Sequence, residues 1–126
     1  MKKIILTLSL LLSTLLSFSQ DKQKFLLYNI SGVELDSCDV PSYFERKLWC
    51  NAYISENIIS FDSVDVTYKK ISPAIDSTSD DYYQIKFLAM DDTHRKCVIT
   101  MIDEHDYIRL IVEYTNCYIL YEMIFD

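Results

Sequence analysis

The most constraining feature of this sequence is residues 82–125, where apolar and polar side chains alternate in four segments separated by short turns. A period of two predicts β-strands, because successive side chains of a strand point to opposite faces of the sheet. A two-residue turn at Thr115 and Asn116 fixes the register of the last two segments. The pairs that follow are Tyr114 with Cys117, Val112 with Ile119, Leu110 with Tyr121, Ile108 with Met123 and, on the other face, Arg109 with Glu122. The stretch therefore predicts an antiparallel meander.

Two longer turns extend this meander toward the N-terminus. A loop over residues 103–106 predicts the pairs Met101 with Ile108, Ile99 with Leu110 and Cys97 with Val112. Residues 91–95 then turn back into a strand with Tyr83, Ile85, Phe87 and Ala89 on the same face. The opposite face mixes apolar and polar residues, which is unusual for a sheet with one face in water. We therefore expect a curved sheet, closed as a small barrel or packed as a sandwich, or a second face that meets a partner.

Residues 1–19 have the features of a signal peptide. Lys2 and Lys3 give a basic start, residues 4–16 are apolar apart from Ser and Thr, and Ser17 and Ser19 are small residues at a cleavage site. The apolar run is shorter than the about 20 residues that span a bilayer, and an uncleaved anchor is the alternative. We predict a periplasmic or secreted protein with one domain at residues 20–126 and no stable membrane insertion after cleavage.

The N-terminal half of that domain predicts shorter elements. Residues 20–38 predict a strand pair or one bent strand, with Gly32 at a turn or bulge. Residues 41–52 predict the one helix, because Phe44, Leu48 and Ala52 recur at every fourth position and Pro41 suits a first turn. Short strands follow at 58–61 and 64–68, with Phe61 facing Val64 and Ile59 facing Val66, and residues 72–81 predict a loop. The expected fold class is mainly β, a curved antiparallel meander with one N-terminal helix packed on it.

Four cysteines lie in the exported part: Cys38, Cys50, Cys97 and Cys117. An oxidising compartment permits disulfides, and an even number favours two bridges over four free thiols. The predicted register separates Cys97 from Cys117 by about 10 Å, two strand spacings, whereas a bridge needs Cα atoms within about 7 Å. Each is then expected to bond to Cys38 or Cys50. A bridge between Cys38 and Cys50, with the other two thiols free, is the alternative.

Charge and motifs narrow the classes of function. Loss of Lys2 and Lys3 with the leader, and of no acidic residue, takes the formal net charge from −7 to −9. Binding to nucleic acid or to an anionic membrane needs a basic patch, so both are disfavoured. The sequence has no HExxH, CxxC or Gly-rich phosphate loop, and His94 and His105 lie at opposite ends of a predicted strand. We expect neither an enzyme nor a bound cofactor.

Carboxylates gather at one predicted pole of the sheet, where a hard cation such as calcium would find oxygen ligands. They are Asp80, Asp81, Asp103, Glu104, Asp106 and Asp126. Solvated turn residues are the alternative, because the Asp-x-Asp-x-Asp-Gly spacing of calcium loops is missing.

The ten tyrosines suggest a recognition surface. Five of them fall off the predicted core face or in loops: Tyr28, Tyr43, Tyr82, Tyr107 and Tyr118. Exposed tyrosine beside apolar surface is typical of protein interfaces, and Tyr82, Tyr107 and Tyr118 are the candidate partner surface. Packing of these rings under the helix and the N-terminal strands is the alternative. The pattern favours a non-enzymatic binding module that recognises a protein partner through an acidic, Tyr-rich surface, such as an inhibitor or an immunity factor.

The order of segments also resembles a known group of proteins. After the two short strands come YYQIKFLAMDD, KCVITMIDE, YIRLIVEY and CYILYEMIF. This arrangement is similar to the small exported lipocalin-like (calycin-type) β proteins of Gram-negative bacteria, although Gly32 is followed by Val33 and Glu34 and the Gly-x-Trp motif is absent. The resemblance implies a small barrel and, as the alternative function, a carrier of an apolar ligand. Two tripeptides, which begin at Asp62 and Asp76, also resemble acceptor sites of periplasmic O-glycosylation, with Ser63 and Ser77 as the acceptors.

Overall fold

Strands make up most of the chain in the computed structural model, which describes residues 23–38, 40–76, 78, 82–104 and 106–125. The nine strands are β1 (Gln23–Leu35), β2 (Pro41–Ile54), β3 (Ile58–Phe61), β4 (Thr67–Lys70), β5 (Ile75–Asp76), β6 (Tyr83–Asp91), β7 (Lys96–Glu104), β8 (Tyr107–Glu113) and β9 (Cys117–Phe125). Every pairing between them is antiparallel.

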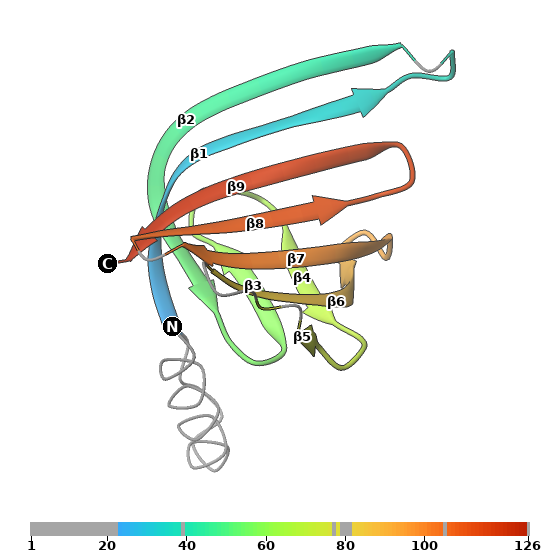
Figure 1. Ribbon diagram of the computed structural model, residues 1–126. Coiled ribbons are helices and arrows are strands. Elements are labelled where there is room, and N and C mark those ends of the chain that lie inside the picture. Colours follow the sequence, from blue (N-terminus) through green and yellow to red (C-terminus); the bar gives the residue numbers. More distant parts are fainter. Residues whose placement is uncertain (1–22, 39, 77, 79–81, 105, 126) are drawn as a thin grey trace.

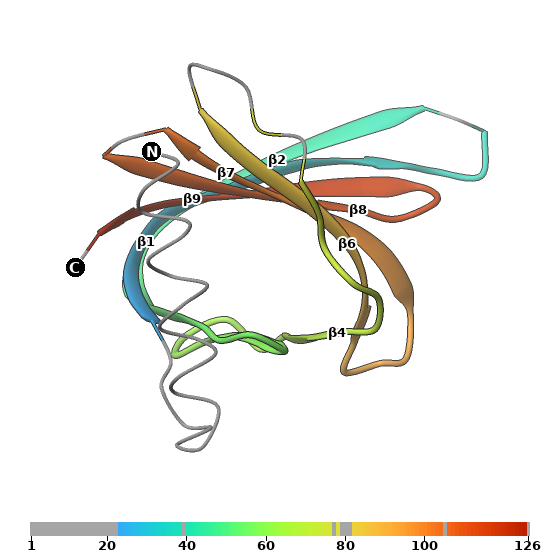
Figure 2. The same cartoon turned by 60° about the horizontal axis from the view of Figure 1, so that its bottom comes forward.

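Eight of these strands form a closed barrel (Figures 1 and 2). The strand order is β4-β3-β2-β1-β9-β8-β7-β6-β5, and an additional pairing of β4 with β6 closes the circle. The short strand β5 lies outside that circle and pairs with β6 through Ile75 and Lys86. The expected curvature of the sheet is therefore confirmed as a barrel.

The predicted register of the meander is confirmed at both ends and shifted in the middle. Val112 pairs with Ile119 in the last hairpin, and Ala89 pairs with Cys97 across the 91–95 turn, as expected. Between β7 and β8, however, Met101 pairs with Leu110 rather than with Ile108. Glu104 pairs with Tyr107, so that two residues and not four connect these strands. Because the shift is an even number of residues, each side chain keeps its predicted face.

The predicted helix at residues 41–52 is wrong, because this segment belongs to β2. No helix occurs in the described part of the chain, and hence none long and apolar enough to span a membrane. Phe44, Leu48 and Ala52 recur at every fourth position, but every fourth position also falls on one face of a strand. Burial alternates only from Leu48 onward, where the exposed Trp49 lies between the half-buried Leu48 and the buried Cys50, whereas residues 41–47 are exposed on both faces.

β1 is a single bent strand, which is one of the two predicted alternatives. Its bulge, however, does not lie at Gly32. The register of β1 shifts between Leu27 and Asn29, and Gly32 is in regular pairing with Phe44 and Ile119. Gly32 is required for space rather than for a turn. A Cβ at this position would lie 2.6 Å from a ring carbon of Phe44, whose side chain lies over the strand.

The pairing of β3 with β4 also differs from the prediction. Ile59 faces Tyr68 instead of Val66, because β4 begins only at Thr67 and a longer connection that includes Val64 joins the two strands. Within this connection the amide of Val66 donates to the carbonyl oxygen of Val64 over 2.9 Å. Tyr68 lies on the inner face of the barrel, where it is buried.

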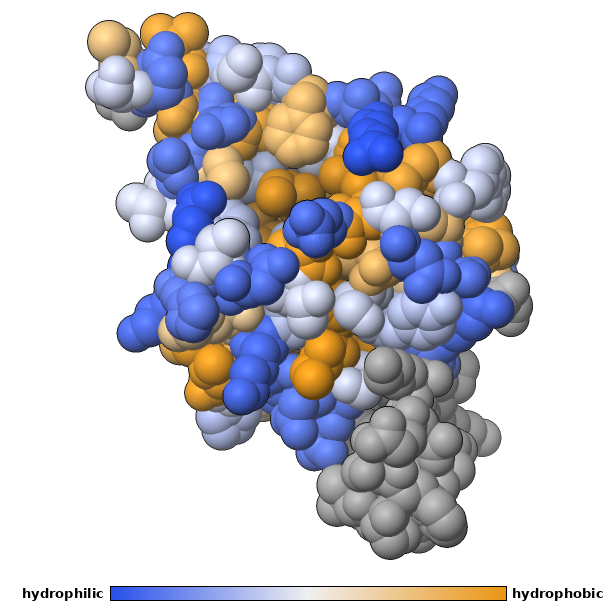
Figure 3. All heavy atoms as spheres, turned by 180° about the vertical axis from the view of Figure 1, so that it is seen from behind, coloured by the Kyte–Doolittle hydropathy of each residue, from blue (hydrophilic) through white to orange (hydrophobic). Residues whose placement is uncertain are grey.

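The core is the interior of the barrel and is built from the inward-facing residues of every long strand. Its largest fully buried side chains are Tyr68, Leu27, Ile99, Leu110, Met123 and Val112. Phe61 stacks on Tyr121 with 4.8 Å between the ring centroids, and Phe25 packs against Phe125 at 5.4 Å. Apolar side chains also reach the surface between polar ones on the face opposite the view of Figure 1 (Figure 3).

The turn between β6 and β7 holds His94 with φ of 66°, the one positive value among the described residues. The left-handed conformation costs a residue with a Cβ about 1–2 kcal/mol, partly offset in glycine by its larger unfolded-state entropy. We expect His94→Gly to raise the free energy of unfolding by about 0.5–1 kcal/mol in urea titrations. His94→Ala is the matched control, because it removes the imidazole and keeps the Cβ. Equal stabilities of the two variants would contradict strain at this position.

Candidate functional site

A line of polar groups runs through the interior of the barrel. The hydroxyls of Tyr68 and Tyr121 share a hydrogen bond of 2.6 Å, and the hydroxyl of Tyr114 donates to Oδ2 of Asp91 over 2.7 Å. Tyr68 also interacts with the Tyr114 hydroxyl and so connects the two pairs. Burial raises the pKa of Tyr121 to about 12 and raises that of Tyr68 as well. These phenols are therefore neutral at physiological pH and act as hydrogen-bond partners inside the core.

Asp91 anchors this line to the turn between β6 and β7. Its Oδ1 accepts hydrogen bonds from the amide of Thr93, the hydroxyl of Thr93 and the amide of Arg95, at 2.8–3.0 Å. Burial by itself would raise the pKa of Asp91, but the hydrogen bonds from Tyr114, Arg95 and Thr93 outweigh it and lower the pKa. The Arg95 guanidinium lies over the Tyr114 ring, 4.3 Å from its centroid. Asp91 is thus an ionised carboxylate whose hydrogen bonds hold a turn.

Two thiols flank Tyr114 on the neighbouring strands. The amide of Tyr114 donates to the carbonyl oxygen of Cys117, while Cys97 is buried on β7 with its Sγ 3.7 Å from the carbonyl oxygen of Ala89. Burial raises the pKa of Cys97 to about 11, and it raises that of Cys117 too. A thiol that stays protonated is a poor nucleophile and a poor metal ligand. The geometry of this cluster is suited to packing rather than to chemistry.

The expected disulfides are not formed, because Cys38, Cys50, Cys97 and Cys117 are all free thiols. The prediction depended on a helix that would bring Cys38 and Cys50 over the sheet. With residues 41–52 extended in β2, Cys38 lies in the exposed turn between β1 and β2, whereas Cys50 is buried in the barrel. Cys97 and Cys117 remain two strands apart, as their register required.

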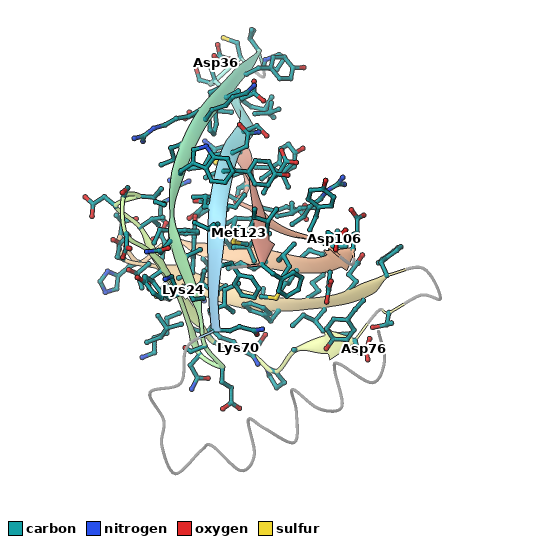
Figure 4. All side chains as sticks on the ribbon, turned by 90° about the vertical axis from the view of Figure 1, so that its left-hand side faces the viewer. Lys24, Asp36, Lys70, Asp76, Asp106 and Met123 are labelled. Atoms are coloured by element: carbon teal, nitrogen blue, oxygen red, sulfur yellow. The ribbon has the colours of Figure 1, made fainter. Side chains whose placement is uncertain are left out.

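The carboxylates proposed for calcium are only partly described. Asp103 pairs with Ile108 and Glu104 pairs with Tyr107, so that the two acidic side chains point to opposite faces of β7. Asp106 is exposed, and Figure 4 shows it on the same side of the barrel as Asp76, far from Asp36 at the β1–β2 turn. Asp80, Asp81 and Asp126 lie outside the described residues. Within the described ranges, no three His, Cys, Asp or Glu residues are placed to hold a metal ion, and calcium binding stays a prediction.

The most distinctive surface is the outer face, which we define as the outward-facing residues of β2, β1, β9 and β8. One aromatic group on it consists of Tyr28, Trp49 and Tyr107. Tyr28 lies 6.0 Å from Trp49 between ring centroids. Tyr107 is near enough to Tyr28 to contribute to the raised pKa of Tyr28, after burial and Glu122. At the other end, Tyr43 and Tyr118 both pair with Val33, which lies between them. The paired strands therefore present two sets of rings, of which Tyr43, Trp49, Tyr107 and Tyr118 are exposed.

A polar strip separates the two aromatic groups. The side-chain nitrogen of Asn29 donates to Glu45 over 3.2 Å and to Glu122 over 3.0 Å, at the bulge in β1. Glu122 pairs with Arg109 across β8 and β9, and Arg109 forms an ion pair of 3.5 Å with Glu104. Burial raises the pKa of Tyr28, and the charge of Glu122 adds to the rise. The strip is therefore hydrogen-bonded and carries more acidic than basic groups.

The structure separates the three tyrosines that were predicted to form one surface. Tyr107 and Tyr118 are both exposed on the outer face, but they pair with Ile124 and Glu113, near opposite ends of that face and about 20 Å apart at 3.4 Å per residue. Tyr82 is half-buried before β6, beyond β7. The residue that sequence reasoning missed is Trp49, whereas Tyr28 and Tyr43 were already among the tyrosines predicted to lie off the core face. Alternation along residues 41–53 was the signal that would have placed Tyr43 and Trp49 on one face.

Of the two serines predicted as glycosylation sites, only Ser63 lies among the described residues. Ser63 is exposed in the connection between β3 and β4, where its neighbour Asp62 accepts hydrogen bonds from Asn51 and Tyr53. Ser77 lies outside the described residues. A sugar on either residue stays a prediction.

Because the pKa of Asp91 is lowered in the folded state, the free energy of unfolding depends on pH in the acidic range. Its stabilising contribution is complete above the unfolded carboxyl pKa of about 3.9, and it is lost as the pH falls through the lower folded-state pKa. We expect Asp91→Asn to lower the free energy of unfolding at pH 7 by about 1.5–3 kcal/mol and to flatten the dependence of stability on pH below 4. The exposed neighbour substitution Asp92→Asn is the control. An unchanged acid limb in Asp91→Asn would contradict the role of this carboxylate.

Comparison of the chain with protein families, with curated proteins and with solved structures gives no match.

Proposed function

We propose that this protein is a non-enzymatic, exported binding module that recognises a basic protein partner through its outer face, in the manner of an inhibitor or an immunity factor. The observation that carries the proposal is the set of exposed rings on rigid paired strands. Tyr43 is 76% exposed, Trp49 is 69% exposed and Tyr107 is 51% exposed. Tyrosine and tryptophan dominate binding energy at protein interfaces, since they bury a large area with few rotatable bonds.

The charge of the chain supports a basic partner. The net charge of the chain is −7. The outer face itself is balanced, with Glu45, Glu113 and Glu122 against Lys24, Lys47 and Arg109. The excess of acidic groups over the whole chain attracts a basic partner and repels an acidic one. Because such attraction is screened by ions, the association rate should fall as salt concentration rises.

A lipocalin-like carrier of an apolar ligand is the second candidate. The closed eight-stranded barrel favours it, since this is the architecture that the resemblance to small exported lipocalin-like proteins implies. Phe87, Tyr121 and Met123 are all buried in the barrel interior, where such a ligand would have to lie. We therefore rank the carrier below the binding module.

The outer face is testable by substitution away from β2. We expect Tyr107→Ala and Tyr118→Ala each to weaken binding to a partner captured from periplasmic extract at low salt, by roughly 30-fold for a loss of about 2 kcal/mol. The measurement is surface plasmon resonance with the purified partner. Ile75→Ala is the control, because Ile75 is 68% exposed on β5 and should leave affinity unchanged. Equal affinities of all three variants and the unaltered protein would reject the outer face as the site.

Native mass spectrometry separates the two candidate functions. If the protein is a binding module, material purified from its own host gives the mass of the mature chain, with or without covalent sugar. A small apolar molecule that is released on gentle activation would favour the carrier instead. Reduction with dithiothreitol should leave the mass unchanged, since the four cysteines are free thiols.

A further inference from the structure

The long strand β2 has one edge that the barrel does not use. β2 has 14 residues and pairs with β1 from Pro41 to Ile54, with a shift of register at Leu48 and Trp49. On its other side, β3 pairs only with Ala52, Tyr53 and Ile54, and the carbonyl oxygen of Asn51 accepts from Asp62. No strand in the described chain pairs with this side of residues 41–50, and Figure 1 shows β2 as the outermost strand of the extended hairpin. Backbone groups on such an edge are a template for a further strand.

The side chains along this edge alternate in a pattern that is complementary to the same edge of a second copy of the chain. Tyr43, Glu45, Lys47 and Trp49 occupy the outer face, while Phe44, Arg46 and Leu48 occupy the inner face. An acidic and a basic residue thus lie two positions apart on the same face, and each has an aromatic residue beyond it. Read in the opposite direction, the pattern is again aromatic, charged, charged, aromatic, with the two charges exchanged.

We propose that β2 pairs antiparallel with β2 of a second copy of the chain, about a two-fold axis at Arg46. This register places Glu45 opposite the partner's Lys47, Tyr43 opposite the partner's Trp49, and Phe44 opposite the partner's Leu48. Because the axis is two-fold, each of these contacts occurs twice. Directly opposed pairs of opposite charge, of aromatic rings and of apolar chains are the ones that stabilise antiparallel sheets.

Neighbouring registers with the same faces aligned are less favourable. An axis at Glu45 sets Glu45 against its own copy and Tyr43 against the partner's Lys47. An axis at Lys47 sets Lys47 against its own copy and Glu45 against the partner's Trp49. Only the axis at Arg46 satisfies both charges on the outer face, so that the sequence selects one register.

Arg46 itself meets its own copy at the axis, and this is the one like-charge contact. It lies on the inner face, away from the two Glu45 and Lys47 pairs, and salt screens it. Edge strands that are protected against pairing carry charges that repel a second copy. Here the charges on the outer face alternate in sign and attract the copy instead. Pairing of the two edges joins the outer faces of the two copies into one wider sheet surface. This dimer goes beyond the proposed partner binding and does not depend on it.

Cysteine scanning tests the register directly. In a Cys38→Ser background, Arg46→Cys, Glu45→Cys and Lys47→Cys are oxidised gently and resolved on non-reducing gels. Opposed residues in an antiparallel pair have Cα atoms about 4.5–5.5 Å apart, within the about 7 Å that a disulfide spans. We expect a covalent dimer from Arg46→Cys alone, because residues 45 and 47 face each other and not their own copies. Preferential cross-linking through position 45 or 47, or none at position 46, would overturn this register.

Sedimentation equilibrium tests the dimer without any cysteine. The unaltered mature chain should show a reversible monomer–dimer equilibrium. Lys47→Glu places an acid opposite the partner's Glu45 twice, and it should weaken the dimer by about tenfold or more. Lys96→Glu makes the same change of charge on β7 and is the matched control, with circular dichroism to verify the fold of both. A monomer at every concentration up to the solubility limit, or equal weakening by both variants, would overturn the proposal.

Discussion

The whole architecture depends on the short seam between β4 and β6. Only three residue pairs join these strands, Tyr68 with Asp91, Lys69 with Met90 and Lys70 with Ala89, whereas β1 and β2 share twelve. The seam holds because its first pair is tied down from inside: the hydroxyl of Tyr68 reaches Tyr121 on the opposite wall, and Asp91 is fixed by its turn and by Tyr114. Without that internal connection the sheet would have two open edges in place of one circle.

Much of this fold was predictable from alternation, and the failures share a physical cause. The hairpin of β8 and β9 followed from a two-residue turn and from matched side chains on both faces. Residues 41–52 were assigned to a helix because the spacing of Phe44, Leu48 and Ala52 fits one face of a helix and also one face of a strand. No single residue distinguishes the two structures. The disulfide prediction failed for the same reason, since the location of Cys38 and Cys50 depended on that helix. The closure of β4 on β6 depends on Tyr68, which the assumed register of the short strands had placed differently.

The candidate surface was harder to predict than the fold. Tyr107 and Tyr118 were recognised as lying off the core face, and both are exposed. Their separation follows from the predicted register of β8 and β9. The burial of Asn29 between Glu45 and Glu122, in contrast, depends on the pairing of β1 with its two neighbours and leaves no trace in the local pattern. Trp49 was assigned to a helix, so its contact with Tyr28 had no basis in the sequence.

The buried tyrosines have a consequence in alkaline solution. An ordinary phenol ionises near pH 10, but desolvation raises the pKa of Tyr68, Tyr114 and Tyr121 above that value in the folded barrel. Between about pH 10 and the raised pKa values of the folded state, the unfolded chain releases protons that the folded chain retains. A rise in pH through this range therefore progressively favours unfolding. The ultraviolet band of tyrosinate should therefore appear in two stages, first from rings at the surface and then, as the barrel opens, from those inside.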